Sequence, residues 1–228
     1  MPLDECEKVC MRMGNHISDA LIQRLPGYYR HLRELEASGI EQVSSQELGE
    51  RMAQTSSLVR QDINSIGGAG RQGYGYQVSE LKNHIRKILG LAEPHTMILI
   101  GAGNMGSAVA RYASFANEGF ETVAMFDNSP SRIGTMVGSM RVQDISELAD
   151  FVKHRHVDIA VLAIPAPAAQ AALDEVIQLG IRGIWNFAPV DLKYDAEQVD
   201  VVNVHLSDTL QVLSYRMCHR AEEKQEEN

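Results

Sequence analysis

A glycine-rich turn between an apolar strand and a helix constrains the fold of this chain more than any other feature. Residues 97–106 read Met-Ile-Leu-Ile-Gly-Ala-Gly-Asn-Met-Gly, and a second apolar stretch ends at Asp127, 26 positions after Gly101. In a Gly-x-Gly-x-x-Gly turn the first glycine permits a tight turn, the second lets backbone approach a diphosphate, and the third lets the helix pack on the strand. The pattern predicts a βαβ unit that binds a dinucleotide, and a purely structural turn is the alternative.

The acid at the end of the second strand predicts which dinucleotide binds. The diphosphate would lie on the amide groups at the helix N-terminus, where the dipole favours negative charge. Asp127 would accept hydrogen bonds from both adenosine ribose hydroxyls and repel a 2′-phosphate, so we expect NAD(H) rather than NADP(H). Apolar surroundings at Phe187 and Pro165 favour the uncharged ring of NADH over the cationic ring of NAD⁺. The predicted cofactor-binding residues are Gly101, Ala102, Gly103, Asn104, Met105, Gly106, Asp127, Asn128, Pro165, Asn186, Phe187, Ala188 and Pro189.

Strands and helices continue to alternate after Asp127. An apolar strand over residues 158–164 precedes a helix over 168–179, which is followed by strands over 183–187 and 201–204. This alternation predicts an α/β fold with a Rossmann-like, doubly wound parallel sheet. Ligands bind beyond the carboxyl ends of such strands, which places Pro165 and the turn at 186–189 near the nicotinamide.

The N-terminal third of the chain predicts a winged-helix domain. Helical patterns span residues 18–38, 44–52 (with Ser44 and Glu47 at capping-box spacing) and 55–66, and a glycine-rich β-ribbon follows at 70–78. In a winged helix the third helix enters the DNA major groove and the ribbon contacts the backbone or minor groove. A helical protein-interaction module is the alternative. The predicted DNA-binding residues are Arg24, Tyr28, Ser57, Arg60, Gln61, Asn64, Arg71 and Gln72.

Charge and composition suggest two domains in a cytoplasmic protein. The net charge of −9 is unevenly distributed, because residues 11–90 carry ten basic and eight acidic side chains whereas residues 91–228 carry ten and nineteen. No stretch approaches a membrane span, and acids near the start argue against a signal peptide. The three cysteines (Cys6, Cys10 and Cys218) lack zinc-site spacing, so we expect no metal. We predict a flexible arm (1–16), a winged helix (17–91), a Rossmann domain (92–206) and a dimerisation helix with a charged tail (207–228). The last helix is expected to end near Glu222, where a solvated and disordered tail begins.

Several short motifs follow one another over both predicted domains. They are Arg24-Leu25-Pro26-x-Tyr28-Tyr29-Arg30, Ser44-Ser45-x-Glu47-Leu48, Val59-Arg60-x-Asp62, Gly73-Tyr74-Gly75-Tyr76, Gly101-Ala102-Gly103-Asn104-Met105-Gly106, Phe126-Asp127, Asn186-Phe187-Ala188-Pro189 and Leu210-Gln211-x-Leu213-Ser214. In this order they resemble the Rex family of redox-sensing transcriptional repressors. The resemblance implies a homodimer whose final helix is exchanged between subunits, and repression of fermentative and respiratory genes that is released when NADH displaces NAD⁺. It also implies a palindromic operator as the DNA partner.

The chain departs from the family pattern in the recognition helix, in the wing and at a switch position. Gln61 and Gln72 replace cations of the family, which changes phosphate attraction and the base edges preferred. His205 replaces an aspartate that pairs alternately with an arginine matching Arg30 and a tyrosine matching Tyr112. A neutral imidazole cannot form that ion pair, so we expect coupling between cofactor and DNA to be weakened or pH-sensitive.

Two other functions remain open from the sequence. An NAD-dependent oxidoreductase needs a proton donor or acceptor beside the nicotinamide, and the sequence contains no Tyr-x-x-x-Lys pair to supply one. We therefore predict that the protein is not an enzyme. The other alternative is a Rex-like, NAD(H)-binding dimer that acts through protein contacts.

Overall fold

The computed structural model describes residues 17–68, 75–112 and 114–226. The chain divides into two compact units, with the boundary between Glu93 and Pro94. The predicted arm at 1–16 and most of the predicted ribbon, including Arg71 and Gln72, lie outside the described residues.

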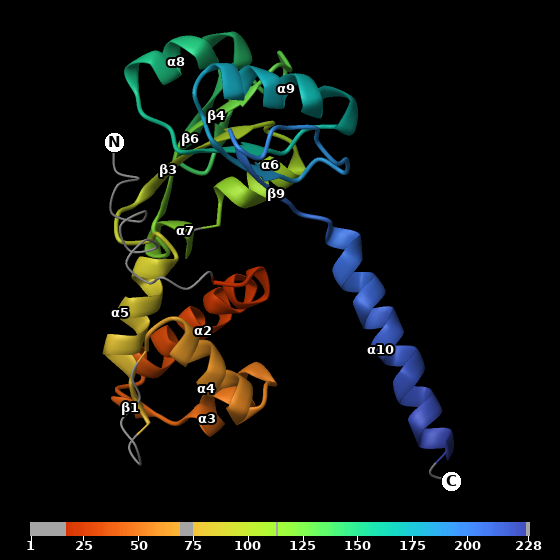
Figure 1. The fold of residues 1–228 in the computed structure, drawn as a ribbon. Coiled ribbons are helices and arrows are strands. Elements are labelled where there is room, and N and C mark those ends of the chain that lie inside the picture. Colours follow the sequence, from red (N-terminus) through yellow and green to blue (C-terminus); the bar gives the residue numbers. More distant parts are fainter. Residues whose placement is uncertain (1–16, 69–74, 113, 227–228) are drawn as a thin grey trace. The chain divides into compact units, whose positions relative to one another are not determined.

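The N-terminal unit consists of helices that begin at polar caps. Ser18, Ser44 and Thr55 cap α2, α3 and α4 with their hydroxyl oxygens, and the predicted capping box between Ser44 and Glu47 is confirmed. A short antiparallel pair joins β1, which precedes α3, to β2, which follows α4. The elements are α2 (Asp19–Ala37), β1 (Gln42–Val43), α3 (Ser45–Met52), α4 (Ser56–Ser65), β2 (Tyr76–Gln77) and α5 (Val78–Ile88) (Figure 1).

One core holds the N-terminal unit together. Leu21, Leu25 and Leu32 recur on one face of α2 at helical spacing and are at most 3% exposed. They pack in the same cluster as Leu81 and Ile85 of α5. Burial of each of these side chains contributes about 1.5–3 kcal/mol relative to leaving it exposed.

The C-terminal unit contains a seven-stranded sheet in the order β5-β6-β4-β3-β7-β8-β9. All neighbouring strands are parallel except β5 and β6, so the six parallel strands follow the order typical of a Rossmann fold. The predicted α/β fold class is confirmed. The strands are β3 (His95–Ile100), β4 (Phe120–Asp127), β5 (Met136–Val137), β6 (Met140–Asp144), β7 (Ile159–Leu162), β8 (Gly183–Asn186) and β9 (Asp200–Asn203).

Sequence reasoning missed β5 and β6. The segment Met140–Asp144 reads Met-Arg-Val-Gln-Asp, and only Val142 is buried. A strand near a sheet edge needs no continuous apolar run, so its pattern is weak. The hydrogen bonds with β4 place it in the sheet.

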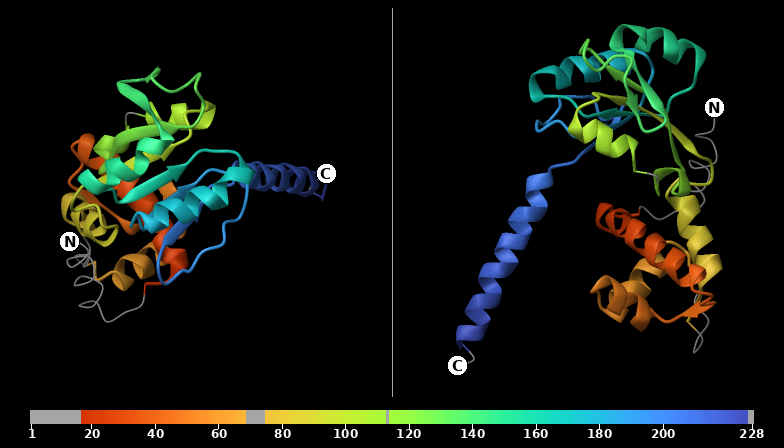
Figure 2. Two further views of the ribbon diagram at one scale, coloured as in Figure 1. Left: turned by 90° about the horizontal axis from the view of Figure 1, so that it is seen from above. Right: turned by 180° about the vertical axis from the view of Figure 1, so that it is seen from behind.

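Helices cover both faces of the sheet. Met97 and Leu99 of β3 belong to one core, whereas Ile98 and Ile100 belong to the other, as the alternation of a strand requires. Residues of α8 and α9 belong to the core that contains Ile98 and Ile100, and residues of α6 and α7 belong to the core that contains Met97 and Leu99. The two helix pairs therefore lie on opposite faces of the sheet (Figures 1 and 2). The helices are α6 (Asn104–Ala110), α7 (Ser114–Asn117), α8 (Leu148–His154, after a 3₁₀ turn at Ile145–Glu147) and α9 (Ala166–Gln178).

The last helix, α10 (Leu206–Glu226), is longer than the sequence predicted. We expected it to end near Glu222 in a disordered tail, and the structure corrects this because the helix continues to Glu226. Several large apolar side chains on it are exposed by half or more. Among the described helices none is long and apolar enough to cross a membrane.

Candidate dinucleotide site and nucleic-acid interface

The backbone of the glycine turn is as tight as the motif predicts. Gly101 has φ +102°, and a Cβ there would clash with the carbonyl oxygen of Ala163. A Cβ on Gly106 would clash with the carbonyl oxygen of Gly101, because α6 packs directly on the end of β3. A Cβ on Gly103 would meet Nη1 of Arg132 at 3.4 Å, and no other described residue beyond its chain neighbours comes within 4 Å. The turn therefore leaves open backbone at its second glycine, as a diphosphate-binding turn requires.

The carboxylate of Asp127 accepts hydrogen bonds from the backbone of the glycine turn and from the backbone that follows β4. One carboxylate oxygen accepts a hydrogen bond from the backbone amide of Ala102 (2.6 Å), and the other accepts one from the amide of Ser129 (2.7 Å). The acid thereby ties the end of β4 to the start of the glycine turn. Each carboxylate oxygen accepts more than one hydrogen bond, so the side chain keeps capacity for ribose hydroxyls.

A cleft of about 710 Å³ lies beside the glycine turn, within the size range of cofactor sites. Seven of the predicted cofactor residues line it, namely Gly101, Gly103, Asn104, Met105, Asp127, Asn128 and Pro165. Sequence reasoning missed the other lining residues, which are Ile100, Ser129, Arg132, Ile145, Ala163, Ile164, Ala168, Ala171, Ala172 and Glu175. The small residues among them follow helical spacing on α9, a signal that is detectable in the sequence.

The turn after β8 is built by Asn186, whose predicted role as a cofactor contact is wrong. This side chain is fully buried, and its amide group donates to the carbonyl oxygens of Ala188 and Val190 and to Oδ1 of Asn203 (2.8 Å). Its Oδ1 accepts from the amide of Ala188. A buried carboxamide is stable only with such partners, so Asn186 shapes the turn. The contacts predicted for Phe187, Ala188 and Pro189 stay predictions, and none of them lines the cleft.

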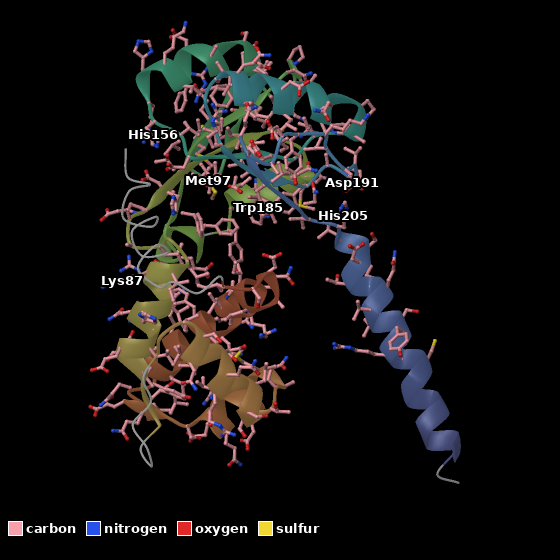
Figure 3. The ribbon with its side chains drawn as sticks, viewed as in Figure 1. Lys87, Met97, His156, Trp185, Asp191 and His205 are labelled. Carbon is pink, nitrogen blue, oxygen red and sulfur yellow. The ribbon has the colours of Figure 1, made fainter. Side chains whose placement is uncertain are left out.

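The predicted switch residues belong to both units. Tyr112 is 54% exposed and packs against Phe115, with ring centroids 4.7 Å apart. His205 lies beside Asp191, with Nε2 3.4 Å from the carboxylate (Figure 3). Arg30 is exposed on α2. Their role in coupling the cofactor to DNA stays a prediction.

The exposed face of α4 carries the predicted DNA-contacting side chains. Ser57, Arg60, Gln61 and Asn64 are all exposed, whereas Val59 and its neighbours Asp62 and Ile63 are buried. Nη1 of Arg60 donates to Oγ of Ser45 in α3 at 3.2 Å. The face combines one guanidinium, two amides and a hydroxyl, the groups that read base edges and bind phosphates in the major groove.

Behind this face, a buried carboxylate attaches α4 to α2. Asp62 is 3% exposed and accepts two hydrogen bonds from Arg24 (2.7 Å each) and one from the hydroxyl of Tyr28 (2.9 Å). The bond to Asp62 raises the pKa of Arg24, while burial and the same carboxylate raise the pKa of Tyr28. Tyr28 is 0% exposed, so its predicted contact with DNA is wrong. Arg24 joins α2 to α4 through its hydrogen bonds with Asp62, and its contact with DNA stays a prediction.

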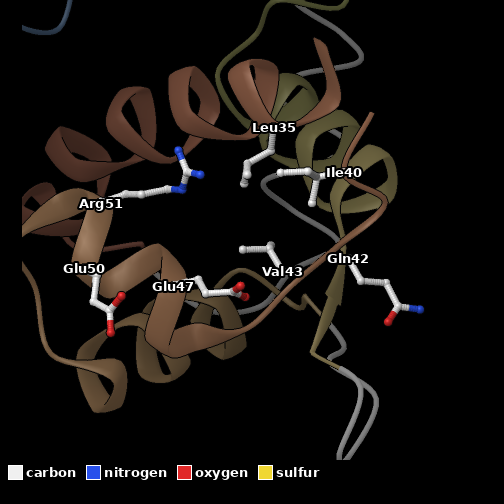
Figure 4. Close-up of a pocket in the computed structure, with 7 residues that line it drawn as sticks. All are labelled: Leu35, Ile40, Gln42, Val43, Glu47, Glu50 and Arg51. Atoms are coloured by element: carbon white, nitrogen blue, oxygen red, sulfur yellow. The ribbon is translucent and has the colours of Figure 1, made fainter. Parts of the chain in front are cut away.

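A second cavity lies in the N-terminal unit and is separate from α4's exposed face. It measures about 360 Å³ and is lined by residues of α2, β1 and α3 and of the loop before β1. Glu47 in its wall is already engaged in the capping box, where hydrogen bonds from Ser44 lower its pKa. The lining residues are Leu35, Ile40, Gln42, Val43, Glu47, Glu50 and Arg51 (Figure 4). In the described part of the chain, no three His, Cys, Asp or Glu side chains group as metal ligands.

Two family profiles match the two units separately. Residues 16–64 match "Putative DNA-binding protein N-terminus", and residues 92–190 match "CoA binding domain". The first covers the helices α2 to α4 and the second covers the glycine turn, the cleft and the sheet up to β8.

Individual relatives match both units together. The redox-sensing transcriptional repressor Rex of Caldanaerobacter subterraneus subsp. tengcongensis is 46% identical over 201 residues, which is 88% of this chain and 89% of the relative. The Rex of Clostridioides difficile is 47% identical over 206 residues, 90% of this chain and 98% of the relative. These relatives are named as repressors and not as enzymes, which argues against the oxidoreductase alternative.

Solved structures of one Rex-family repressor, RSP, share the fold. RSP alone has a TM-score of 0.84 at 42% identity and covers 94% of this chain and 100% of its own. RSP with β-NAD⁺ and operator DNA has a TM-score of 0.83 at 44% identity, with 92% and 97% covered. Another RSP structure contains β-NADH, with a TM-score of 0.83 at 42% identity and 92% and 98% covered. Since identity above 40% extends over both the helical unit and the glycine-turn sheet, this chain belongs to the Rex family of redox-sensing transcriptional repressors.

Proposed function

We propose that this protein is a repressor that binds palindromic operator DNA and releases it when NADH replaces NAD⁺. The observation that carries the proposal is one chain with two sites: an NAD(H)-type cleft at the glycine turn and an exposed polar face on α4. Structures of the relative RSP with NADH and with NAD⁺ plus operator DNA support it. A cytoplasmic location follows from the proposal, because the operator lies there.

The cleft residues fit a dinucleotide. Gly101 and Gly106 stand where a Cβ would clash with backbone, so their absence of side chains is structurally required. Asp127 at the end of β4 would accept hydrogen bonds from the adenosine ribose hydroxyls of NAD(H), and its charge would repel the 2′-phosphate of NADP(H). The dinucleotide would supply a redox-dependent signal, because NAD⁺ and NADH differ only in the charge and shape of the nicotinamide ring.

The face of α4 fits the major groove. Arg60 would donate two hydrogen bonds to a guanine, and Gln61 has the donor and acceptor that match an adenine. In a two-fold dimer the two copies of α4 would meet two half-sites, so the operator would be an inverted repeat. Gln61 therefore gives this chain a different preference at one position from relatives with a cation there.

A binding titration against a Rex-type palindrome tests the function directly. We expect operator binding to weaken at least tenfold when NADH replaces NAD⁺ at saturating concentration, as measured by fluorescence anisotropy. Arg60→Ala should weaken binding about 5- to 150-fold, because a bidentate base contact contributes about 1–3 kcal/mol. Arg86→Ala on α5 removes an exposed arginine of the same unit from a different helix, and we expect it to leave the affinity within twofold.

The outcome also separates the alternatives. If the wild type selects no DNA sequence with either cofactor but binds NADH, a dimer acting through protein contacts becomes the better explanation. If it turns over NADH with carbonyl substrates, the oxidoreductase alternative gains the advantage.

We further propose a homodimer held by α10. Leu206, Leu210, Leu213 and Met217 follow one another at helical spacing and are each at least 52% exposed. A continuous apolar stripe of this kind needs a cover, and a second copy supplies one through an interface that two-fold symmetry makes reciprocal.

Truncation of α10 tests the dimer. Deleting residues 206–228 should abolish the dimer in light scattering and expose apolar surface, so that the product aggregates. Deleting only residues 219–228 keeps the stripe and removes the charged end, and we expect it to stay dimeric. A stable dimer without residues 206–228 would contradict the proposal.

A further inference from the structure

The cleft at the glycine turn contains one basic side chain among its described lining residues, and this is Arg132. The same lining includes two acids, Asp127 and Glu175. A dinucleotide brings a diphosphate with two negative charges into this setting. The other lining residues carry no formal charge, so Arg132 is the group among them that can balance the charge of the diphosphate.

The backbone holds Arg132 in place. Its amide donates to the carbonyl oxygen of Ser129 (2.9 Å), and its own carbonyl oxygen accepts from the amide (3.0 Å) and the hydroxyl (2.6 Å) of Thr135. These bonds belong to the turns that follow β4, whose end is fixed by Asp127. The side chain therefore starts from an ordered position beside the cleft.

The guanidinium lies over the open backbone of the glycine turn. Its Nη1 lies 3.4 Å from the position where a Cβ of Gly103 would stand. Arg132 is partly buried, and among the described ion pairs none joins it to a carboxylate within 4.0 Å. Asp127, the acid at the same turn, is engaged by two backbone amides instead. The guanidinium thus keeps its donors for an anion.

We propose that Arg132 binds the diphosphate of NADH and NAD⁺ and supplies the charge that the glycine turn lacks. The inference rests on the proposed function of the cleft. Guanidinium groups form paired, charge-assisted hydrogen bonds with phosphate oxygens. The helix after the turn, α6, has seven residues and offers the anion a partial positive charge at its N-terminus, to which the guanidinium adds a full charge. Both redox forms carry the same diphosphate, so Arg132 sets the affinity for both without setting the preference between them.

Calorimetric titration of Arg132→Gln, Arg132→Lys and the wild type with NADH, NAD⁺, NADPH, ADP and adenosine tests the inference. Arg132→Gln should weaken NADH, NAD⁺ and ADP each by about tenfold to a hundredfold, the usual range for charge-assisted hydrogen bonds. Adenosine has no phosphate and should bind within twofold of the wild type. Arg132→Lys should recover part of the loss. Arg141→Gln is the matched control, because Arg141 lies on β6 and does not line the cleft, and it should leave every affinity unchanged.

Three outcomes would overturn the role of Arg132. One is NADH and ADP affinity within twofold of the wild type in Arg132→Gln. Another is an equal loss for adenosine and ADP, which would indicate a damaged cleft. A third is weakened NADPH with unchanged NADH, which would place the guanidinium at the 2′-position of the ribose. If the wild type bound neither NADH nor NAD⁺, the proposed function itself would fail, which is a different result.

Discussion

Replacing Gly106 by alanine is expected to weaken NADH binding at least a hundredfold and to lower the free energy of unfolding of the C-terminal unit by about 2–3 kcal/mol. The added Cβ would clash with the carbonyl oxygen of Gly101, which is backbone and cannot rotate away. Gly101 also packs closely on the backbone of Ala163, so a shift of Gly101 would disturb the ends of both β3 and β7. Urea unfolding and calorimetric titration with NADH measure the two effects.

Gly180→Ala provides the control for the glycine turn. Gly180 follows α9 with φ +92°, and a Cβ there would meet no atom of the other described residues within 4 Å, its chain neighbours aside. We expect a cost of about 1 kcal/mol from the left-handed backbone alone, with NADH binding unchanged. Gly106→Ala with NADH affinity within threefold of the wild type would show that the close approach of α6 to β3 does not shape the site.

Replacing Asp62 by alanine is expected to lower the free energy of unfolding of the N-terminal unit by about 3 kcal/mol. This value is at the lower end of the range for breaking a buried ion pair, because Arg24 is partly exposed. The change leaves the guanidinium of Arg24 and the hydroxyl of Tyr28 without their shared acceptor. Because this acceptor joins α2 to α4, operator affinity should fall too. Amide hydrogen exchange in α2 and α4 reports on this unit separately.

A surface pair and a pH series serve as controls for Asp62. Glu36→Ala breaks the exposed bridge to Lys82 and should cost at most about 1 kcal/mol. The pKa of Tyr28 is higher in the folded protein than in the unfolded chain, where it is about 10. The protonated hydroxyl therefore stabilises the fold fully below about pH 10, and this stabilisation is lost as the pH rises through the folded pKa. Tyr28→Phe should abolish this alkaline loss. A cost below about 1 kcal/mol for Asp62→Ala would contradict the role given to the buried carboxylate.

Much of the fold was predictable because its signals are local. The capping box at Ser44 and Glu47 joins residues three apart, and the requirement for glycine at Gly101 comes from its own φ angle. Apolar runs predicted the central strands β3 and β7, since strands buried on both faces have no polar alternation. The exposed face of α4 follows from helical spacing alone.

The strand β6, which lies next to the edge strand β5, and the length of α10 were not predictable in the same way. β6 contains one buried residue, and its identity as a strand depends on hydrogen bonds to β4, which lies elsewhere in the sequence. The acidic end of α10 has the composition of a solvated tail, although glutamate and lysine are good helix formers. Composition alone does not decide between these two states.

The sequence by itself determined the two-part architecture, the glycine turn with Asp127 and the polar face of α4, because caps, glycine conformations and apolar periodicity act over a few residues. Only the tertiary structure decided that Tyr28 is a core residue bonded to Asp62, that Asn186 shapes a turn, and that Arg132 reaches the glycine turn. Arg132 and Gly103 are 29 positions apart, and Tyr28 and Asp62 are 34 apart. Burial and partnership over such separations depend on how helices and strands pack, which no local pattern specifies.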